Sequence, residues 1–168
     1  MIGPEYVTTM AAYNRWQNDQ LLSAADGLDD AARRLERGAF FGSIQATLNH
    51  ILWADQTWMH RLANAPAPGA KSIAESLTQY ATWTEFKSAR RALDQVLIEW
   101  ASTLEPEMLV GELQWFSGSI GHAVRTPRWL VVTHMFNHQT HHRGQVHAML
   151  TAAGAKLGPT DLLLMPKA

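Results

Sequence analysis

Five of the chain's eight histidines fall within eighteen residues, in the segment THMFNHQTHHRGQVHAML from Thr133 to Leu150. Imidazole titrates near neutral pH and is a common metal ligand, so this density raises the question of which rings could share one cation. On a helix that turns about 100° per residue, His138 and His142 lie one turn apart in the middle of the apolar stripe. Two neutral imidazoles at this spacing can bind one metal ion.

The other three histidines of this segment are placed less favourably. His134 and His141 fall at the edge of the apolar stripe, and His147 faces away from it. A simpler interpretation of any buried histidine is a core ring that is hydrogen-bonded to a carbonyl or carboxylate. For two neighbouring rings a metal is the better interpretation, because it satisfies both in their neutral form, whereas a proton on either ring would be costly to bury.

A third ligand is expected on an earlier helix. His50 lies in TLNHILWADQTW with an alanine one turn away on either side, which leaves room for the ring between helices. Asp55 competes for this role, but five residues rotate it by about 140° from His50, so both cannot face one cation. We therefore predict His50 as the ligand and Asp55 as a tether between helices or an acceptor behind the ligands. His60 and His122 are expected to be peripheral.

Four long segments with helical periodicity position these histidines. The expected helices run from about Glu5 to Ala25, from Ser43 as N-cap to Asn64, from about Thr82 to Leu104, and from Thr126 as N-cap, with Pro127 first in the helix, to the closing Gly154. Four helices of about twenty residues predict an all-α four-helix bundle. The segment VGELQWFSGSIGHAVR, with three glycines, predicts a long irregular connection before the last helix, with a short hairpin.

Length and composition restrict the remaining possibilities. A chain of 168 residues is most simply one domain, residues 1–168. With Lys+Arg 14 against Asp+Glu 15 and no basic run, nucleic acid is a poor candidate partner. The absence of cysteine excludes a disulfide, a thiolate nucleophile and a Cys-type zinc site. Neither a signal peptide nor an apolar run of about 20 residues is present, so we expect no membrane partner and a cytoplasmic location.

Several segments are distinctive in combination: YNRWQNDQLL, TLNHILWADQTWMHRL, HMFNHQTHHRGQVHAML and the later GPTDLLL. Together they resemble the DinB family, also described as DinB/YfiT-like metal-dependent proteins, with N-H-x-x-H-H-R-G-Q as the most specific part. The resemblance implies a four-helix bundle of up-down-down-up topology, a homodimer, and a divalent metal held by three histidines, here His50, His138 and His142. It also implies thiol-dependent S-transferase or isomerase activity with a low-molecular-weight bacterial thiol.

A three-histidine site with an open position is typical of catalytic zinc, whereas structural zinc sites are closed by four protein ligands. Imidazole suits zinc and nickel equally, so both are candidates. We expect a metal-dependent enzyme of thiol-dependent S-transferase or hydrolase type acting on a small molecule. The alternative is a non-catalytic, metal-stabilised binding or sensor module. Gln145 could orient a water or substrate, and Arg143 is expected to be a solvated or interface residue.

The sequence lacks the motifs of two other kinds of metal site. A zincin needs H-E-x-x-H, but Gln139, Thr140 and His141 stand between the two ligand histidines. A di-iron bundle needs E-x-x-H, which does not occur. The seven tryptophans are expected mainly in the core.

The last helix also carries a second apolar strip. Val132, Phe136 and Leu150 fall well away from the ligand stripe. We expect a connector, the tail with Leu162–Leu164, or another chain to cover this strip, and we predict a two-fold homodimer.

Overall fold

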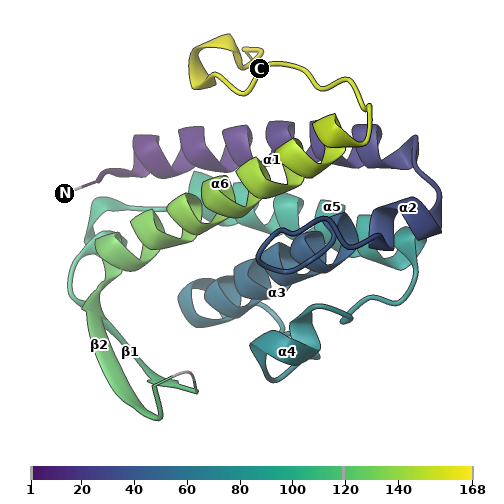
Figure 1. Cartoon of the computed structure of the whole chain (residues 1–168). Coiled ribbons are helices and arrows are strands. Elements are labelled where there is room, and N and C mark those ends of the chain that lie inside the picture. Colours follow the sequence, from purple (N-terminus) through teal and green to yellow (C-terminus); the bar gives the residue numbers. More distant parts are fainter. Residues whose placement is uncertain (1, 119, 168) are drawn as a thin grey trace.

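The computed structural model describes residues 2–118 and 120–167, and in this part of the chain the protein is mostly helical (Figure 1). The helices are α1 (Pro4–Asp26), α2 (Asp30–Arg34), α3 (Ile44–Ala63), α4 (Ile73–Ser76), α5 (Trp83–Ser102) and α6 (Arg128–Ala152), with single 3-10 turns at Pro106–Leu109 and Leu162–Leu164. Strands β1 (Glu112–Ser117) and β2 (His122–Pro127) form an antiparallel hairpin between α5 and α6. The four long predicted helices are α1, α3, α5 and α6.

Local capping explains where two of these helices begin. The Ser43 hydroxyl accepts a hydrogen bond of 3.2 Å from the backbone N–H of Ala46 at the start of α3. At α5, Thr82 and Glu85 satisfy each other's backbone N–H groups in a capping box. Ser43 therefore fills the predicted N-cap position.

The predicted start of α6 was wrong by one residue. Thr126 was expected to cap this helix, but it pairs with Leu113 in the hairpin and stays extended. Pro127 occupies the N-cap position without a side-chain hydrogen bond, and Arg128 is the first helical residue. The strand therefore runs directly into the helix. Gly154, with φ of +85°, follows the last turn in the left-handed conformation that favours glycine.

The strands correct the all-α prediction, because the connection before the last helix is an ordered hairpin. Pairing runs from Glu112 opposite Pro127 to Ser117 opposite His122. Figure 1 shows the hairpin extending away from the four long helices beside the end of α3. The ring of Trp115 on β1 lies 5.4 Å from that of Trp58 on α3, which fixes the hairpin against this helix.

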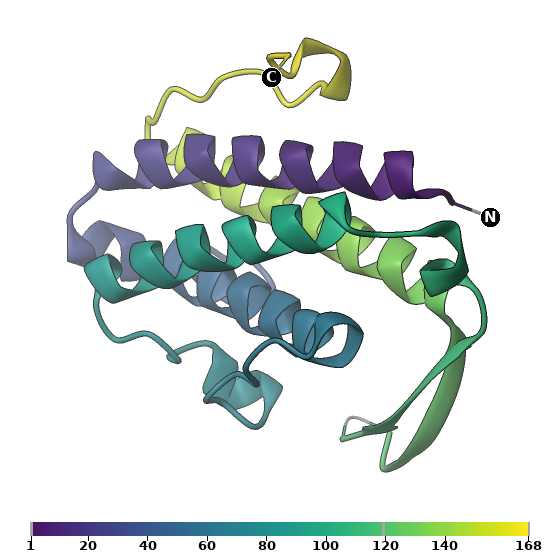
Figure 2. The same cartoon turned by 180° about the vertical axis from the view of Figure 1, so that it is seen from behind.

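One core joins the four long helices. Helix α6 packs against both α3 and α1, while α5 packs against α1 and α3, as the two views show (Figures 1 and 2). The up-down-down-up order of the helices stays a prediction. Among the described residues, no helix is both long and apolar enough to cross a membrane.

The second apolar strip of α6 is covered within the chain. Val132, Phe136 and Leu150 are fully buried in the core, and Phe136 contacts the ring of Tyr6 on α1. The tail does not provide this cover, since Leu163 is 96% exposed. The strip therefore gives no reason to expect a second chain, because the chain's own core already buries it.

Candidate metal centre

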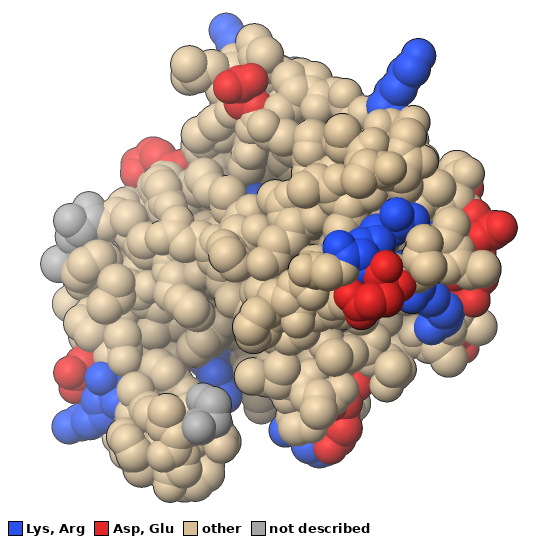
Figure 3. All heavy atoms as spheres, viewed as in Figure 1, with Lys and Arg blue, Asp and Glu red and all other residues tan. Residues whose placement is uncertain are grey.

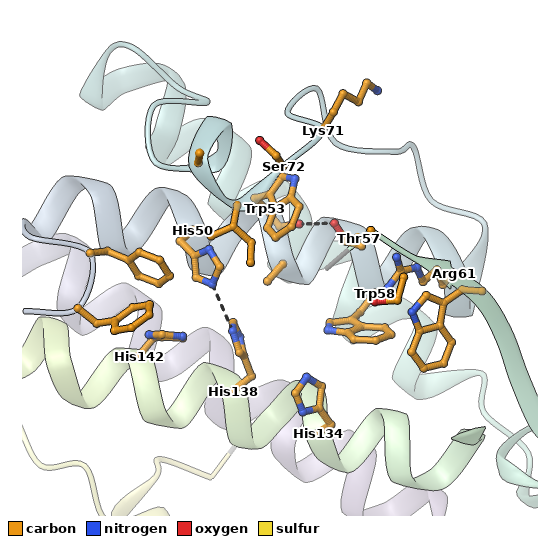
Figure 4. A pocket seen from close by; sticks show the side chains of 18 residues that line it. His50, Trp53, Thr57, Trp58, Arg61, Lys71, Ser72, His134, His138 and His142 are labelled. Carbon is orange, nitrogen blue, oxygen red and sulfur yellow. Dashed lines mark hydrogen bonds between the residues drawn. The ribbon is translucent and has the colours of Figure 1, made fainter. Parts of the chain in front are cut away.

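The three predicted ligands converge between α3 and α6. His50 comes from α3, and His138 and His142 come from successive turns of α6. One nitrogen from each ring lies within 4.8 Å of the others, and the Nε2 atoms of His50 and His138 are 3.3 Å apart. The structure thus brings together the three residues that the helical angles selected (Figure 4).

Two of the rings have their other nitrogen fixed by an oxygen acceptor. The Ser76 hydroxyl donates to the carbonyl of Ile73 at 2.6 Å, which leaves its oxygen to accept from Nδ1–H of His50 at 3.2 Å. The side-chain oxygen of Gln145 accepts from Nδ1–H of His142 at 2.8 Å. Each hydrogen bond places the proton on Nδ1 and leaves the Nε2 lone pair free for a cation.

Burial keeps these rings neutral. It lowers the pKa of His50 to about 4, with a smaller contribution from His142. Burial, followed by the neighbouring histidines, lowers the pKa of His138 to about 3. The pKa of His142 is also lowered by burial, although its hydrogen bond to Gln145 opposes this shift. At neutral pH all three rings are therefore in the form that binds metals.

The geometry fits a divalent metal ion. Two nitrogens at about 2.05 Å from a tetrahedral zinc lie about 3.3 Å apart, which matches the separation of the Nε2 atoms of His50 and His138. Nδ1 of His138 is buried and has no hydrogen-bond partner among the described residues. Since Ser76 fixes the lone pair of His50 toward His138, a proton or a cation must lie between the two rings.

A phenylalanine from the loop before α3 forms one wall of the centre. The ring of Phe41 lies 4.1 Å from that of His50 and 5.3 Å from that of His142. Gly38 and Gly42, with φ of +72° and +77°, allow the tight turn that presents this ring. No prediction from the sequence included Phe41, although AFFG, an aromatic pair beside a glycine, was the available signal.

The centre lines a cavity of about 800 Å³ between α3, α6, the hairpin and the start of α4. Figure 3 shows the molecular face hollowed between the hairpin and α4, with basic atoms visible in the hollow. The aromatic lining residues are Phe40, Phe41, Trp53, Trp58 and Trp115. The lining residues with ionisable side chains are His50, His134, His138, His142, Arg61 and Lys71. Among the described lining residues none is acidic, so the cavity is aromatic and basic.

A buried polar network lies behind the three histidines. Asp55 on α3 accepts hydrogen bonds from Arg90 on α5 at 2.6 Å and from Gln139 on α6 at 2.9 Å. Arg90 also donates to Asp94 at 2.8 Å. Burial raises the pKa of both carboxyl groups, and their pairing with Arg90 opposes this shift. Asp55 is thus the predicted tether between helices and lies outside the histidine cluster.

The prediction for Arg143 was wrong. This residue was expected in solvent or at an interface, but it is only 5% exposed and donates to the side-chain oxygen of Asn14 on α1. Its guanidinium carbon also lies 5.5 Å from the centre of the Tyr13 ring. Burial lowers the pKa of Arg143 to about 10. The helical angle correctly placed Arg143 on a different side of α6 from the clustered histidines. That side packs against α1 and is not exposed to solvent.

The other histidines lie outside the cluster. His134 lines the cavity one turn before His138, and His141 is exposed at the surface. His147 is half-buried beside Tyr13 and Thr160, in a separate small pocket. His60 and His122 are exposed, as expected for peripheral residues.

The tryptophans and Gln145 differ from expectation. Three of the tryptophans expected in the core line the cavity instead, and no tryptophan is fully buried.

Gln145 was considered as a group that orients water or substrate, but its oxygen already accepts a hydrogen bond from His142. Ser76 and Arg61 were missed, because Ser76 lies far from the histidines in sequence and Arg61 carries no metal-ligand signal.

The fold and the site together define a helical protein with a three-histidine cluster at the base of an open cavity. The whole chain, residues 1–168, matches the DinB family, and the protein therefore belongs to that family.

Two relatives agree with this assignment. The chain is 27% identical over 158 residues to Protein DinB of Bacillus subtilis (strain 168), covering 94% of this chain and 91% of that protein. It also resembles the crystal structure of a DinB-like protein from Bacillus cereus ATCC 10987, with a TM-score of 0.62 and 16% identity, over 86% of this chain and 91% of the other. The second likeness concerns the fold alone.

Proposed function

We propose that this protein binds one divalent metal ion, zinc or nickel, through His50, His138 and His142 and is a metal-dependent enzyme. The proposed activity is of the thiol-dependent S-transferase or hydrolase type, on a small molecule with a low-molecular-weight thiol as candidate co-substrate. One observation carries the proposal: the three nitrogens converge on a cavity of about 800 Å³. A closed shell of four protein ligands without a cavity would have favoured a structural or sensor role instead.

The chain's own groups have defined parts in this proposal. A bound metal would act as a Lewis acid that lowers the pKa of an incoming thiol or water and so supplies the nucleophile that a chain without cysteine lacks. Ser76 and Gln145 hold the rings of His50 and His142 in the tautomer that leaves Nε2 as a ligand. Phe41 covers one side of the cluster and limits access of water to it.

A cobalt-substituted protein tests whether the site accepts a thiol. Co²⁺ occupies zinc sites of this kind, and a thiolate that ligates it gives an intense near-ultraviolet charge-transfer band. We expect this band when 2-mercaptoethanol is added to the wild-type Co²⁺ protein and no band in His138→Gln. A Co²⁺ spectrum that saturating thiol does not change would contradict thiol chemistry at this centre.

A turnover assay separates the enzyme from the binding module. Thiol-dependent loss of an electrophilic substrate such as 1-chloro-2,4-dinitrobenzene should require the metal and stop on chelation. The binding or sensor alternative expects no turnover with any bacterial thiol, and metal removal would then lower only the melting temperature.

We also propose that residues 1–168 form one domain with the up-down-down-up helix order of the family and act as a homodimer in the cytoplasm. The single core supports one domain. The exposed Leu162, Leu163 and Leu164 offer an apolar surface for a partner chain. Sedimentation at micromolar concentration decides the assembly: a monomer of 18.7 kDa would contradict the dimer.

A further inference from the structure

Arg61 lies on the same face of α3 as His50, at the other end of the cavity. Eleven residues separate them, which places them about 16 Å apart along the helix axis and about 20° apart around it. Both line the cavity. Figure 4 shows His50 and His142 at one end, Arg61 and Trp58 at the other, and His138 and His134 between them.

Two indole rings hold the Arg61 guanidinium in place. Its central carbon lies 4.8 Å from the centre of the Trp58 ring and 5.4 Å from the centre of the Trp115 ring. Trp58 belongs to α3 and Trp115 to β1, so the helix and the hairpin together position this cation. A guanidinium held against aromatic rings keeps its N–H donors available for an anion.

Arg61 has no anionic partner in the part of the chain that the structure describes. Among the described residues it forms no ion pair and no hydrogen bond, in contrast to Arg90, which pairs with two aspartates. It is nevertheless half-buried, and burial lowers its pKa. A partly desolvated cation without a counter-ion in an aromatic cavity is suited to bind an anionic ligand, since a charge-assisted hydrogen bond is stronger where water is excluded.

We infer that Arg61 anchors a carboxylate of the substrate, whose apolar body lies along the indole rings and whose other end reaches the histidine cluster. A carboxylate matches the planar fork of arginine with two parallel hydrogen bonds. The contact between the other end of the substrate and the histidine cluster rests on the proposed function, whereas carboxylate binding at Arg61 does not. Arg61 is thus a specificity-determining residue, and the substrate class is an amphipathic carboxylate.

The inference is tested with 4-phenylbutyrate and its neutral counterpart 4-phenylbutan-1-ol, whose binding to the full-length protein is measured by titration calorimetry. We expect the wild type to bind the carboxylate at least about tenfold more tightly than the alcohol. Arg61→Gln should lose this preference, and Arg61→Lys should keep part of it because the charge remains. Arg15→Gln, at an exposed position of α1 outside the cavity lining, is the matched control and should behave like the wild type.

A second variant separates this inference from the metal proposal. His138→Gln should keep the preference for the carboxylate, because Trp58 and Trp115, and not His138, hold the Arg61 guanidinium. A preference that survives in Arg61→Gln but disappears in His138→Gln would assign the carboxylate to the histidine cluster and overturn the inference. Equal binding of acid and alcohol by the wild type, or no measurable binding of the acid, would overturn it as well. Melting curves of each variant, compared with the wild type, show whether a lost preference comes from unfolding. An Arg61→Gln protein that melts like the wild type and still prefers the acid would contradict the role of Arg61 as the carboxylate anchor.

Discussion

At the scale of single residues, a ligand imidazole depends on the group behind it. Ser76 accepts the Nδ1 proton of His50 and Gln145 accepts that of His142, and both acceptors are uncharged. Such partners fix the tautomer and orientation of the ring and raise its basicity as a ligand. Substitution of Ser76 or Gln145 should therefore change metal affinity while all three histidines remain in place.

Ser76→Ala should weaken zinc binding by about 10- to 100-fold, because His50 loses the acceptor that holds its proton on Nδ1. Competition with a chromogenic zinc chelator measures the change. Ser88→Ala, at an exposed position of α5, is the control and should leave the affinity unchanged. Equal affinities in all three proteins would show that Ser76 does not support the ligand.

The metal-free protein should lose stability as the pH falls from about 6.5 toward 4. In the folded state the pKa of His50 is lowered to about 4 and that of His138 to about 3, whereas both titrate near 6.5 in an unfolded chain. In this window the unfolded chain binds more protons than the folded one, so the free energy of unfolding rises with pH and falls with acidification.

Urea unfolding of chelator-treated protein at several pH values measures this slope. Other groups also titrate, so the comparison is with His138→Gln, which should show a shallower dependence between pH 6.5 and 4. Identical slopes for the two proteins would contradict the lowered pKa of His138.

Counting helical angles identified all three histidines, since they lie on regular helices with apolar neighbours. The same count places Arg61 about 20° from His50 and so on the same side of α3. Ser76 and Phe41 could not be found this way. They approach the rings only through the tertiary packing of α4 and of the loop before α3, which no local pattern encodes.

At the scale of helices and strands, the buried polar network connects the two helices that carry the three clustered histidines. Asp55 bridges α3 to α5 and α6, and Arg143 and Asn14 extend the contacts to α1. The spacing of His50 from His138 and His142 therefore depends on charges that are buried behind them.

Asp55→Ala should lower the free energy of unfolding by about 3–5 kcal/mol, because it breaks the buried ion pair with Arg90 and leaves an Arg90 N–H and the Gln139 amide without their acceptor in the core. It should also weaken metal binding, since α3 and α6 lose a tether. Urea denaturation and zinc competition measure the two effects. Asp19→Ala, on the exposed side of α1, should change neither. A variant with wild-type stability would show that the network does not hold the helices together.

Periodicity predicted the long helices well, but it failed where two signals compete. Thr126 followed by Pro127 has the sequence of a helix start, yet the pairing of Thr126 with Leu113 keeps it in the strand. The two apolar sides of α6 suggested a partner chain, yet a helix packed between α1 and α3 needs both sides. Which neighbour covers a given side is a property of the packed chain and not of the helix.

At the scale of the whole molecule, a metal that binds only the folded state stabilises it by mass action. With free zinc at about 100 times its dissociation constant, the free energy of unfolding should rise by about 2.7 kcal/mol. Thermal melts with and without EDTA measure this effect. The wild type should show a higher melting temperature with zinc, and His138→Gln should show no response to either treatment. A wild-type melting temperature that zinc does not change would argue against a specific site.

The most direct test is the metal content of the protein purified without a nickel column, measured by inductively coupled plasma mass spectrometry. The wild type should contain close to one zinc or nickel per chain, and His138→Gln should contain almost none. His147→Gln, in the same helix but outside the cluster, should match the wild type. Full occupancy in His138→Gln, or loss of metal in His147→Gln alone, would contradict a centre formed by His50, His138 and His142.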